Sequence, residues 1–300
     1  MDKNTTIQPA KPFVKWAGGK SQLLKDIRAK YPAVLGEQIN KYAEPFVGGG
    51  AVLFDVLNRH AVSEVFISDI NAELIHTYTT IRDKLSELLE ILSKLEQEYL
   101  SVADEERKKI YYEKREQFNT FKIGEGKSTE LAALFIFLNR TCFNGLYRVN
   151  AKGNFNVPQG SYKKPCICDT KNLHAVSAKL QNVKIVHGDY RQSADFVDDK
   201  TFVYFDPPYR PLSQTANFTS YAQGGFDDTA QRELAKFIDT LSARGAYIVA
   251  SNSDPRNVDK TDDFFDKLYA LYKINRISAN RMINCNAENR RAVNELLICN

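Results

Sequence analysis

The sequence predicts an α/β fold in which an open sheet with helices on both faces is interrupted by an inserted lobe. Short apolar runs that end in glycine, proline or an acid alternate with helical patterns, at residues 42–47, 65–68, 183–186, 202–205 and 246–250. This alternation is typical of parallel strands joined by helices. Strand patterns stop at residue 71 and helical patterns continue to residue 142, which predicts the insertion. The 300 residues, 43% of them hydrophobic, suffice for a large core and a second lobe.

Composition limits the classes of protein that the chain can represent. Charged residues make up 26%, and we find no apolar stretch as long as a membrane span and no apolar signal core in residues 1–10. Five cysteines without a C-x-x-C pair predict free thiols rather than disulfides or a zinc site. We therefore expect a cytoplasmic protein without a metal. A net charge of +4 and a pI of about 8.6 permit a nucleic-acid partner.

A glycine turn opens the first helical pattern at Lys15-Trp16-Ala17-Gly18-Gly19-Lys20. It is not a phosphate-binding P-loop, because that motif needs glycine where this chain has Val14. Trp16 and Lys20 are instead placed to touch a ligand. In the alternative interpretation, Trp16 is a core aromatic residue and Lys20 a solvated helix residue.

A second glycine turn, Gly48-Gly49-Gly50, joins the strand pattern at 42–47 to a helix that begins near Ala51. Glycines at this place allow the backbone to pass close to a ligand. The next strand pattern ends in Asp69, at the distance where nucleoside-binding α/β units carry the acid that binds ribose. Asp69 could also be the N-cap of the following helix.

The insertion is rich in cations between residues 107 and 164, and its leucines at 85, 88, 89, 92 and 95 form one helical stripe. The segment from Arg140 to Arg148 ends in aromatic residues beside an arginine, and residues 150–162 have the pattern of a β-hairpin. Basic residues interleaved with aromatics suit phosphate contact and base stacking. The alternative is an ordinary solvated hairpin.

The sheet resumes at residues 183–186, and the strand pattern at 202–205 ends in Asp206-Pro207-Pro208-Tyr209. The acid and the carbonyl of Pro207 could accept both hydrogens of a planar exocyclic amine while Tyr209 stacks on its ring. The alternative is a plain Pro-Pro turn. The remaining chain predicts a lid at 210–225, a helix at 227–243 and last strands at 268–277 and 293–299.

Taken with Glu44-Pro45-Phe46-Val47-Gly48-Gly49-Gly50, Asp69-Ile70-Asn71 and Phe143-Asn144-Gly145-Leu146-Tyr147-Arg148, these motifs resemble the Dam family of adenine-N6 DNA methyltransferases. The resemblance runs from about residue 12 to the end of the chain, and the segment 212–221 also matches. It implies a Rossmann-like methyltransferase sheet, S-adenosylmethionine as methyl donor and GATC as the target.

The resemblance also implies site residues. Asp206, Pro207, Pro208 and Tyr209 match the catalytic motif. The cofactor set comprises Trp16, Ala17, Lys20, Glu44, Pro45, Phe46, Gly48, Gly50, Asp69, Ile70, Asp189, Tyr190 and Asp206. The DNA-binding set comprises Lys15, Arg140, Phe143, Asn144, Leu146, Arg148, Pro158 and Tyr162, with Phe143 as a wedge.

We therefore expect a site-specific enzyme, bacterial or phage-encoded, that acts on double-stranded DNA as a monomer without a metal. Residues 1–71 and 169–300 would form the catalytic domain, and residues 72–168 the target-recognition domain. Two alternatives remain. The first is a methyltransferase for RNA, protein glutamine or another amine, and the second is a non-catalytic DNA-binding module.

Overall fold

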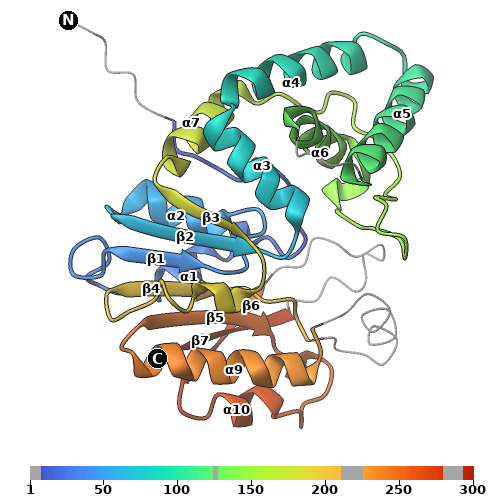
Figure 1. The fold of residues 1–300 in the computed structure, drawn as a ribbon. Coiled ribbons are helices and arrows are strands. Elements are labelled where there is room, and N and C mark those ends of the chain that lie inside the picture. Colours follow the sequence, from blue (N-terminus) through green and yellow to red (C-terminus); the bar gives the residue numbers. More distant parts are fainter. Residues whose placement is uncertain (1–7, 124–127, 211–225, 280–292) are drawn as a thin grey trace, which may run out of the picture. The chain divides into compact units, whose positions relative to one another are not determined.

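The computed structural model describes residues 8–123, 128–210, 226–279 and 293–300 (Figure 1). Its strands form one sheet of seven in the order β3-β2-β1-β4-β5-β7-β6. The parallel and antiparallel pairings make this a mixed sheet, and the predicted α/β class is confirmed. The strands are β1 (Lys41–Glu44), β2 (Glu64–Asp69), β3 (Val183–His187), β4 (Thr201–Phe205), β5 (Tyr247–Ser253), β6 (Lys273–Ala279) and β7 (Val293–Cys299).

Helices connect most of the strands. They are α1 (Leu24–Arg28), α2 (Ala51–Arg59), α3 (Ala72–Asp83), α4 (Leu85–Leu100), α5 (Asp104–Ile123), α6 (Thr129–Thr141), α7 (Thr170–Leu180), α9 (Asp228–Ala243) and α10 (Phe264–Leu268). Four of them, α3 to α6, follow one another without an intervening strand, as the helical patterns of the insertion predict.

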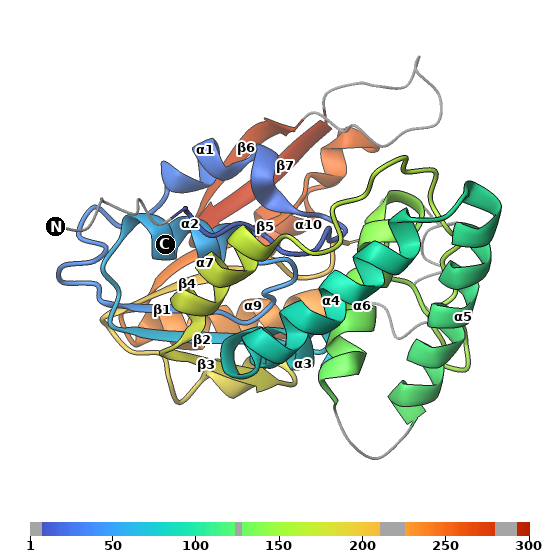
Figure 2. The same cartoon turned by 90° about the horizontal axis from the view of Figure 1, so that it is seen from above.

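The chain divides into two compact units, and one of them contains most of the strands. This strand-rich unit comprises Lys20–Val47, His60–Ser68 and Asp189–Asn300. Helices α1 and α9 lie on opposite faces of its strands (Figures 1 and 2). Every residue of β4 is buried, because this central strand is covered on both faces.

The order of the strands reverses within this unit. Lys41 of β1 pairs in parallel with Glu64 of β2 on one side and with Thr201 of β4 on the other. The strand that follows β1 in the sequence, β2, therefore lies on one side of the β1–β4 pair, and the strand that follows β4, β5, lies on the other side. Open sheets bind ligands at the carboxyl ends of strands beside such a reversal, which here are the ends of β1 and β4.

The other unit, which we call the helical unit, comprises Gly48–Arg59, Asp69–Gly188 and the described residues of Met1–Gly19. Its central helix α6 is buried along nearly its whole length. Leu88, Leu92 and Leu95 of α4 are buried, so the predicted leucine stripe faces the core at three of its positions. The predicted boundaries of the two functional domains follow the motifs rather than this packing, and they stay a prediction.

Three asparagine side chains hold the extended segment at residues 10–15 in the helical unit. Asn58, Asn172 and Asn139 each accept from the N–H and donate to the C=O of one backbone residue. The residues held are Ala10, Lys11 and Lys15, respectively. The segment is thus fixed by amide pairs in place of a neighbouring strand.

Some predicted elements differ from those observed. Strand β1 ends at Glu44 because the following Pro45 has no N–H to donate. The predicted strand at 268–277 begins five residues later, since its apolar start belongs to α10 and the turn after it. Residues 150–162 form no strand ladder, only the isolated bridges Val149–Phe155 and Cys142–Gln159. The predicted lid and the family match at 212–221 lie outside the described residues.

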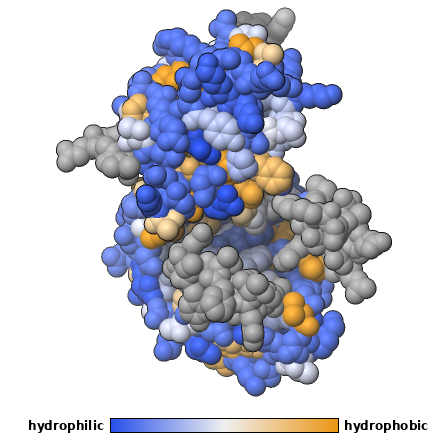
Figure 3. Space-filling view, turned by 90° about the vertical axis from the view of Figure 1, so that its right-hand side faces the viewer, coloured by the Kyte–Doolittle hydropathy of each residue, from blue (hydrophilic) through white to orange (hydrophobic). Residues whose placement is uncertain are grey.

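In the part of the chain that the structure describes, no helix is long and apolar enough to cross a membrane. The same residues contain no group of three His, Cys, Asp or Glu side chains that could hold a metal ion. Figure 3 shows one face of the molecule, which carries mainly hydrophilic residues with apolar ones in small groups.

Candidate functional site

The turn that contains Asp206 follows the buried strand β4, as predicted. Oδ1 of Asp206 lies 2.8 Å from Nζ of Lys20 and accepts a hydrogen bond from Ser251 Oγ, also at 2.8 Å. Lys20 is only 3% exposed, so water screens its charge weakly. Both contacts fall on Oδ1, which leaves Oδ2 able to accept from a ligand. Lys20 is thus the counter-charge of the predicted catalytic carboxylate, and its predicted contact with the cofactor stays a prediction.

The ring of Tyr209 is held at both its hydroxyl and its face. Its hydroxyl donates to Oε2 of Glu295 on β7, and Nζ of Lys20 lies 4.7 Å from the ring centroid. Burial, followed by the charges of Asp206 and Glu295, raises the pKa of Tyr209 well above its usual value. The hydroxyl therefore stays protonated and acts as a donor that fixes the ring.

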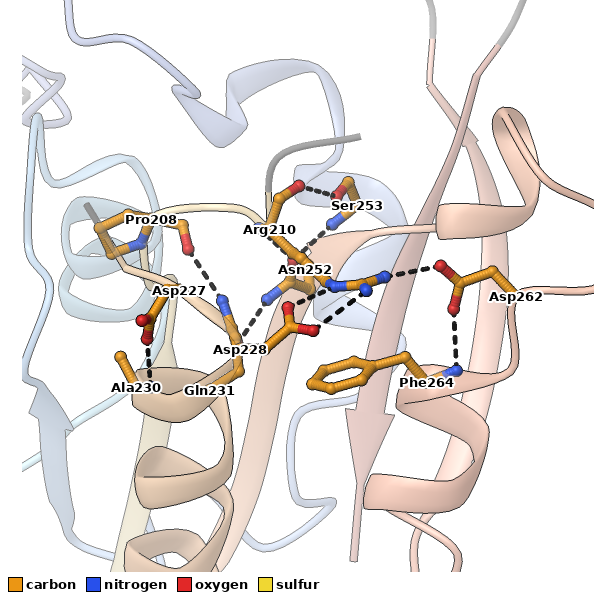
Figure 4. A network of polar contacts seen from close by, with 10 residues as sticks. All are labelled: Pro208, Arg210, Asp227, Asp228, Ala230, Gln231, Asn252, Ser253, Asp262 and Phe264. Carbon is orange, nitrogen blue, oxygen red and sulfur yellow. Dashed lines mark hydrogen bonds and ion pairs between the residues drawn. The ribbon is translucent and has the colours of Figure 1, made fainter. Parts of the chain in front are cut away.

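Buried amides hold the backbone of the same turn (Figure 4). Gln231 Nε2 donates to the carbonyl of Pro208 at 3.1 Å, and Asn252 Nδ2 donates to Gln231 Oε1 at 3.2 Å. The N–H of Arg210 donates back to Asn252 Oδ1 at 3.3 Å. The two amides thus bracket Tyr209 from both sides. Both side chains are fully enclosed, at 0% and 3% exposed, which favours a single arrangement.

Arg210 clamps the residues that follow the turn. Its guanidinium donates to Asp228 at the start of α9 and to Asp262, each through a contact of 2.6 Å (Figure 4). Its Cζ also lies 4.4 Å from the ring centroid of Phe264. The clamp fastens the end of the turn to the start of α9 and to the segment just before α10.

An aromatic cluster lies at the end of β1. The rings of Phe46 and Tyr190, both predicted cofactor contacts, stack with centroids 5.4 Å apart. Phe226 packs edge-on against Phe46 at 5.9 Å. Asp189 caps the turn that begins with Tyr190 and pairs with Arg191. The structure therefore brings Phe46, Asp189 and Tyr190 together within the strand-rich unit.

Glu44 and Pro45 are engaged inside this unit. Glu44 is 2% exposed and accepts a hydrogen bond from Tyr42 at 2.6 Å. Burial, followed by the charge of Glu44, raises the pKa of Tyr42 well above its usual value, so Tyr42 remains a donor. The carbonyl of Pro45 accepts from Ser68 Oγ at 3.2 Å. These contacts fix the backbone that carries Phe46.

In the helical unit, backbone donors orient the carboxylate of Asp69. Its oxygens accept from the N–H of Gly48 at 3.1 Å and of Asn71 at 2.9 Å. Burial raises the pKa of Asp69, and these hydrogen bonds oppose the shift. The N-cap of α3 is Asn71, which accepts from Leu74 N–H, so the alternative of Asp69 as that cap is wrong. The adjacent Ile70 is 75% exposed.

The glycines of the second turn are required by internal packing. Gly48 and Gly50 have φ of 47° and 73°, in the left-handed region. A Cβ at Gly48 would lie 2.7 Å from Cδ1 of Trp16, and one at Gly50 would lie 2.5 Å from the hydroxyl of Tyr78. The predicted closeness of these glycines to a ligand stays a prediction. Ala17, next to Trp16, is exposed.

Trp16 also contacts the predicted recognition segment. Its ring stacks on Tyr147 with centroids 5.7 Å apart. The hydroxyl of Tyr147 donates to Glu73 at 3.1 Å, and Lys122 lies 3.0 Å from the same carboxylate. Within the helical unit, the first glycine motif and the segment at 143–148 are therefore packed together, with Trp16 only partly exposed.

A strained turn presents the predicted wedge. Phe143 is 51% exposed, and the following Asn144 has φ of 55°, the one non-glycine residue with positive φ in the described chain. Backbone strain of this kind is concentrated at ligand-binding sites. The carbonyl of Pro158 accepts from the N–H of Phe143 at 2.9 Å, which places Pro158 beside the turn.

Other predicted DNA contacts lie around the same turn. Nζ of Lys15 donates to the hydroxyl of Tyr162 at 3.1 Å. Arg148 is exposed, and its Nε donates to Asn156 Oδ1 at 2.8 Å, which braces the guanidinium. The carbonyl of Leu146 accepts from the thiol of Cys142. Arg140, at the end of α6, has a buried Nε without a hydrogen-bond partner in the described structure.

Sequence reasoning missed several residues of the site: Ser251, Glu295, Gln231, Asn252 and Asn139. A signal was present for two of them. Residues 251–254 are polar and follow directly on the apolar run at 246–250, and polar residues at the carboxyl end of a parallel strand are candidates for a site. Nothing in the sequence pairs Glu295 with Tyr209, because a single acid within a strand pattern is commonly a solvated residue.

Known proteins match along nearly the whole chain. Type II methyltransferase M.MjaIII of Methanocaldococcus jannaschii is 50% identical over 97% of this chain and 99% of its own length. Type II methyltransferase M1.LlaDCHI of Lactococcus lactis is 36% identical over 97% of this chain and 95% of its own length. The DNA adenine methylase of Salmonella typhi is 35% identical over 95% of this chain and 93% of its own length.

A family model agrees with these relatives. The model described as D12 class N6 adenine-specific DNA methyltransferase matches residues 16–283, which include both glycine turns, the recognition segment and the turn at Asp206. The resemblance found in the sequence motifs is thereby confirmed. The chain belongs to the D12 class of N6 adenine-specific DNA methyltransferases.

Proposed function

We propose that this enzyme methylates N6 of the adenine in GATC sequences of duplex DNA, after the adenine has been flipped out of the helix. The observation that carries the proposal is the turn at Asp206. It stands at the carboxyl end of β4, beside the reversal of strand order, and its acid is held by Lys20 and Ser251. The relatives named DNA adenine methylase support the choice of adenine N6.

S-adenosylmethionine is the expected cofactor of an enzyme in this family. It supplies an electrophilic methyl group when bound. The carboxylate of Asp69 fits this group, because two backbone N–H donors fix its orientation beside the exposed Ile70. We assign Asp69 to the ribose hydroxyls, and the aromatic pair Phe46–Tyr190 to the same cofactor.

In the proposed mechanism, Asp206 and the Pro207 carbonyl accept the two hydrogens of the adenine amine. These hydrogen bonds would withdraw the nitrogen lone pair from conjugation with the ring and orient it toward the methyl group that the cofactor would supply. Tyr209 stacks on the flipped base, with its ring held by Glu295. Lys20 supplies the counter-charge of Asp206, and the carboxylate would offset the positive charge on the methylated amine until that amine releases its proton to water.

For DNA, we propose that residues 72–168 read the target and that Lys15, Phe143, Asn144, Leu146, Arg148, Pro158 and Tyr162 contact it, with Arg140 close by. The exposed Phe143 would fill the space that the flipped base leaves. We further propose that the enzyme acts as a monomer in the cytoplasm. The family decides against RNA, protein glutamine or other amines as the substrate class and against a non-catalytic module.

The proposal is tested with purified enzyme and a short duplex that contains one GATC site. We expect the duplex to gain one methyl group per strand and to resist a nuclease that cuts only unmethylated GATC. Duplexes with each base pair substituted in turn, single-stranded RNA and a glutamine peptide serve as comparisons. Equal methylation of substituted duplexes would overturn the GATC assignment. A duplex whose target adenine is cross-linked to its partner base tests base flipping, because methylation of an adenine that cannot leave the helix would overturn it.

A further inference from the structure

Asn139 connects two predicted DNA-contacting segments that are far apart in the sequence. Its Oδ1 accepts from the N–H of Lys15 at 2.8 Å, and its Nδ2 donates to the C=O of Lys15 at 2.8 Å and of Gly145 at 3.0 Å. The side chain is 4% exposed, so both hydrogens and the oxygen of the amide are used inside the protein. A buried amide satisfied in this way allows one arrangement of its partners.

The two segments also touch directly. A Cβ on Gly145 would lie 2.5 Å from Cδ and 2.6 Å from Cβ of Lys15. Lys15 in turn reaches Tyr162, and Gly145 closes the strained turn that carries Phe143 and Asn144. The position of the Lys15 side chain and the position of the turn are therefore set together, at one point on α6.

We propose that Asn139 is a positioning residue for sequence discrimination. By holding Lys15 and the turn at 143–145 in one register, it makes the contacts of both segments with the target simultaneous rather than independent. Base discrimination depends on such registration, because a hydrogen bond to a base edge tolerates little displacement. Asn139 itself contacts neither DNA nor cofactor. The inference rests on the proposed function, in which Lys15 and this turn contact DNA.

The chain offers a matched control for Asn139. Asn172 on α7 is 3% exposed and clamps the backbone of Lys11 in the same way, accepting from its N–H at 2.9 Å and donating to its C=O at 3.0 Å. Asn172 therefore holds the same extended segment without bonding to the recognition turn. Asn139→Ala and Asn172→Ala each remove a buried amide clamp, so a difference between them reports what Asn139 positions.

The experiment compares methylation rates on the GATC duplex and on duplexes substituted at each base pair. We expect Asn139→Ala to lower the ratio of cognate to substituted rates about 10-fold, whereas Asn172→Ala keeps the wild-type ratio. Cofactor affinity by calorimetry and the thermal midpoint should be alike in the two variants. Equal ratios in the two variants, whether both retained or both lost, would overturn the inference.

A second pair of variants decides the matter if Asn139→Ala does not fold. Gly145→Ala would push a methyl group against Lys15 while Asn139 stays intact. Gly153→Ala is its control, because φ at Gly153 is also positive, at 79°, but an added Cβ there would meet nothing within 4 Å. A lower ratio of cognate to substituted rates in Gly145→Ala alone supports the inference, and the same ratio in both variants overturns it. Failure of the wild-type enzyme to prefer GATC would instead contradict the proposed function.

Discussion

One oxygen of the Asp206 carboxylate is occupied by Lys20 and Ser251, and the other faces the substrate in the proposed mechanism. We expect Asp206→Asn to lower the rate of methyl transfer about 100-fold or more, because the amide places a donor where the amine needs an acceptor. Single-turnover kinetics measures this rate. Ser251→Ala, which keeps the carboxylate but removes one of its holders, should fall between wild type and Asp206→Asn. Near-normal transfer by Asp206→Asn would contradict the mechanism.

Asp69 gives cofactor binding a dependence on pH. Its pKa is raised in the folded protein, mainly by burial, so protonation is favoured at a higher pH than for an ordinary aspartate. The raised pKa means that the folded state gains stability from protonated Asp69 at low pH and loses this gain as pH rises through the folded pKa. Cofactor hydroxyls need the ionised form, so affinity should fall on acidification through that same range.

The test measures cofactor affinity by calorimetry across pH for the wild type and Asp69→Asn. At neutral pH the variant should bind more weakly by about 1.5–3 kcal/mol for each charge-assisted hydrogen bond lost. Its affinity should also lose the acid dependence, since it has no proton to gain at this position. An unchanged pH profile in Asp69→Asn would remove Asp69 from the ribose site.

At the scale of elements, the last strand bears on catalysis through a single residue. Glu295 of β7 holds the hydroxyl of Tyr209, which stacks on the base in the proposed mechanism. Tyr209→Phe keeps the ring but frees it, so we expect kcat to fall about 10-fold with little change in KM for DNA. Glu295→Gln should cause a smaller fall, because the amide still accepts a hydrogen bond. If Glu295→Gln lowers kcat more than Tyr209→Phe does, Glu295 acts on catalysis by a route other than the Tyr209 hydroxyl.

Arg148 stands in the recognition segment and is braced by Asn156. A braced guanidinium suits bidentate contact with the O6 and N7 acceptors of guanine, so Arg148→Ala should cost roughly 1–3 kcal/mol and relax preference at one base pair. A phosphate contact would instead weaken all sequences alike and lower the salt dependence. Rates on duplexes substituted at each G·C pair separate these outcomes. The same slowing on every duplex would assign Arg148 to the DNA backbone.

The elements themselves were predictable where hydrophobic period and breakers agreed. The buried strand before Asp206, the helix with Asp227 as its N-cap and the helical insertion follow from local sequence. Residues 150–162 did not, because their turn is held by the side chain of Asn150, which accepts from two backbone N–H groups in place of a strand ladder. Side-chain capping of this kind leaves no period in the sequence.

For the site, local motifs indicated which residues matter but not how they are paired. The glycine motif that Lys20 ends predicts a ligand-binding residue, but it does not show that Lys20 pairs with Asp206, which lies far along the chain. Asn139 likewise has no sequence signal that pairs it with Lys15 and Gly145. Such pairings depend on the order of strands and on the packing of α6, which a single sequence does not report.

At the scale of the molecule, the net charge of +4 understates how basic the insertion is. Lys163 and Lys164 are exposed in it, so we expect each to neutralise a phosphate when DNA binds. Replacing either by Gln should lower the slope of log affinity against log salt by about 0.9, without changing the preferred sequence. Lys267→Gln is a control, since this exposed lysine on α10 pairs with Asp263. If the slope is unchanged in both Lys163→Gln and Lys164→Gln, these two lysines do not contact the DNA phosphates.

The sheet order has a consequence for how the chain is made on the ribosome. Strand β1 can pair with β2 as soon as both emerge, but its other neighbour, β4, is translated only after the entire insertion: Lys41 pairs with Thr201. At about 5–20 residues per second, that delay is roughly ten to thirty seconds. Throughout it, the apolar edge of β1 at Tyr42 and Ala43 is open to other nascent chains. Recovery of folded enzyme should therefore depend on chaperones or slow expression that protect this edge during synthesis.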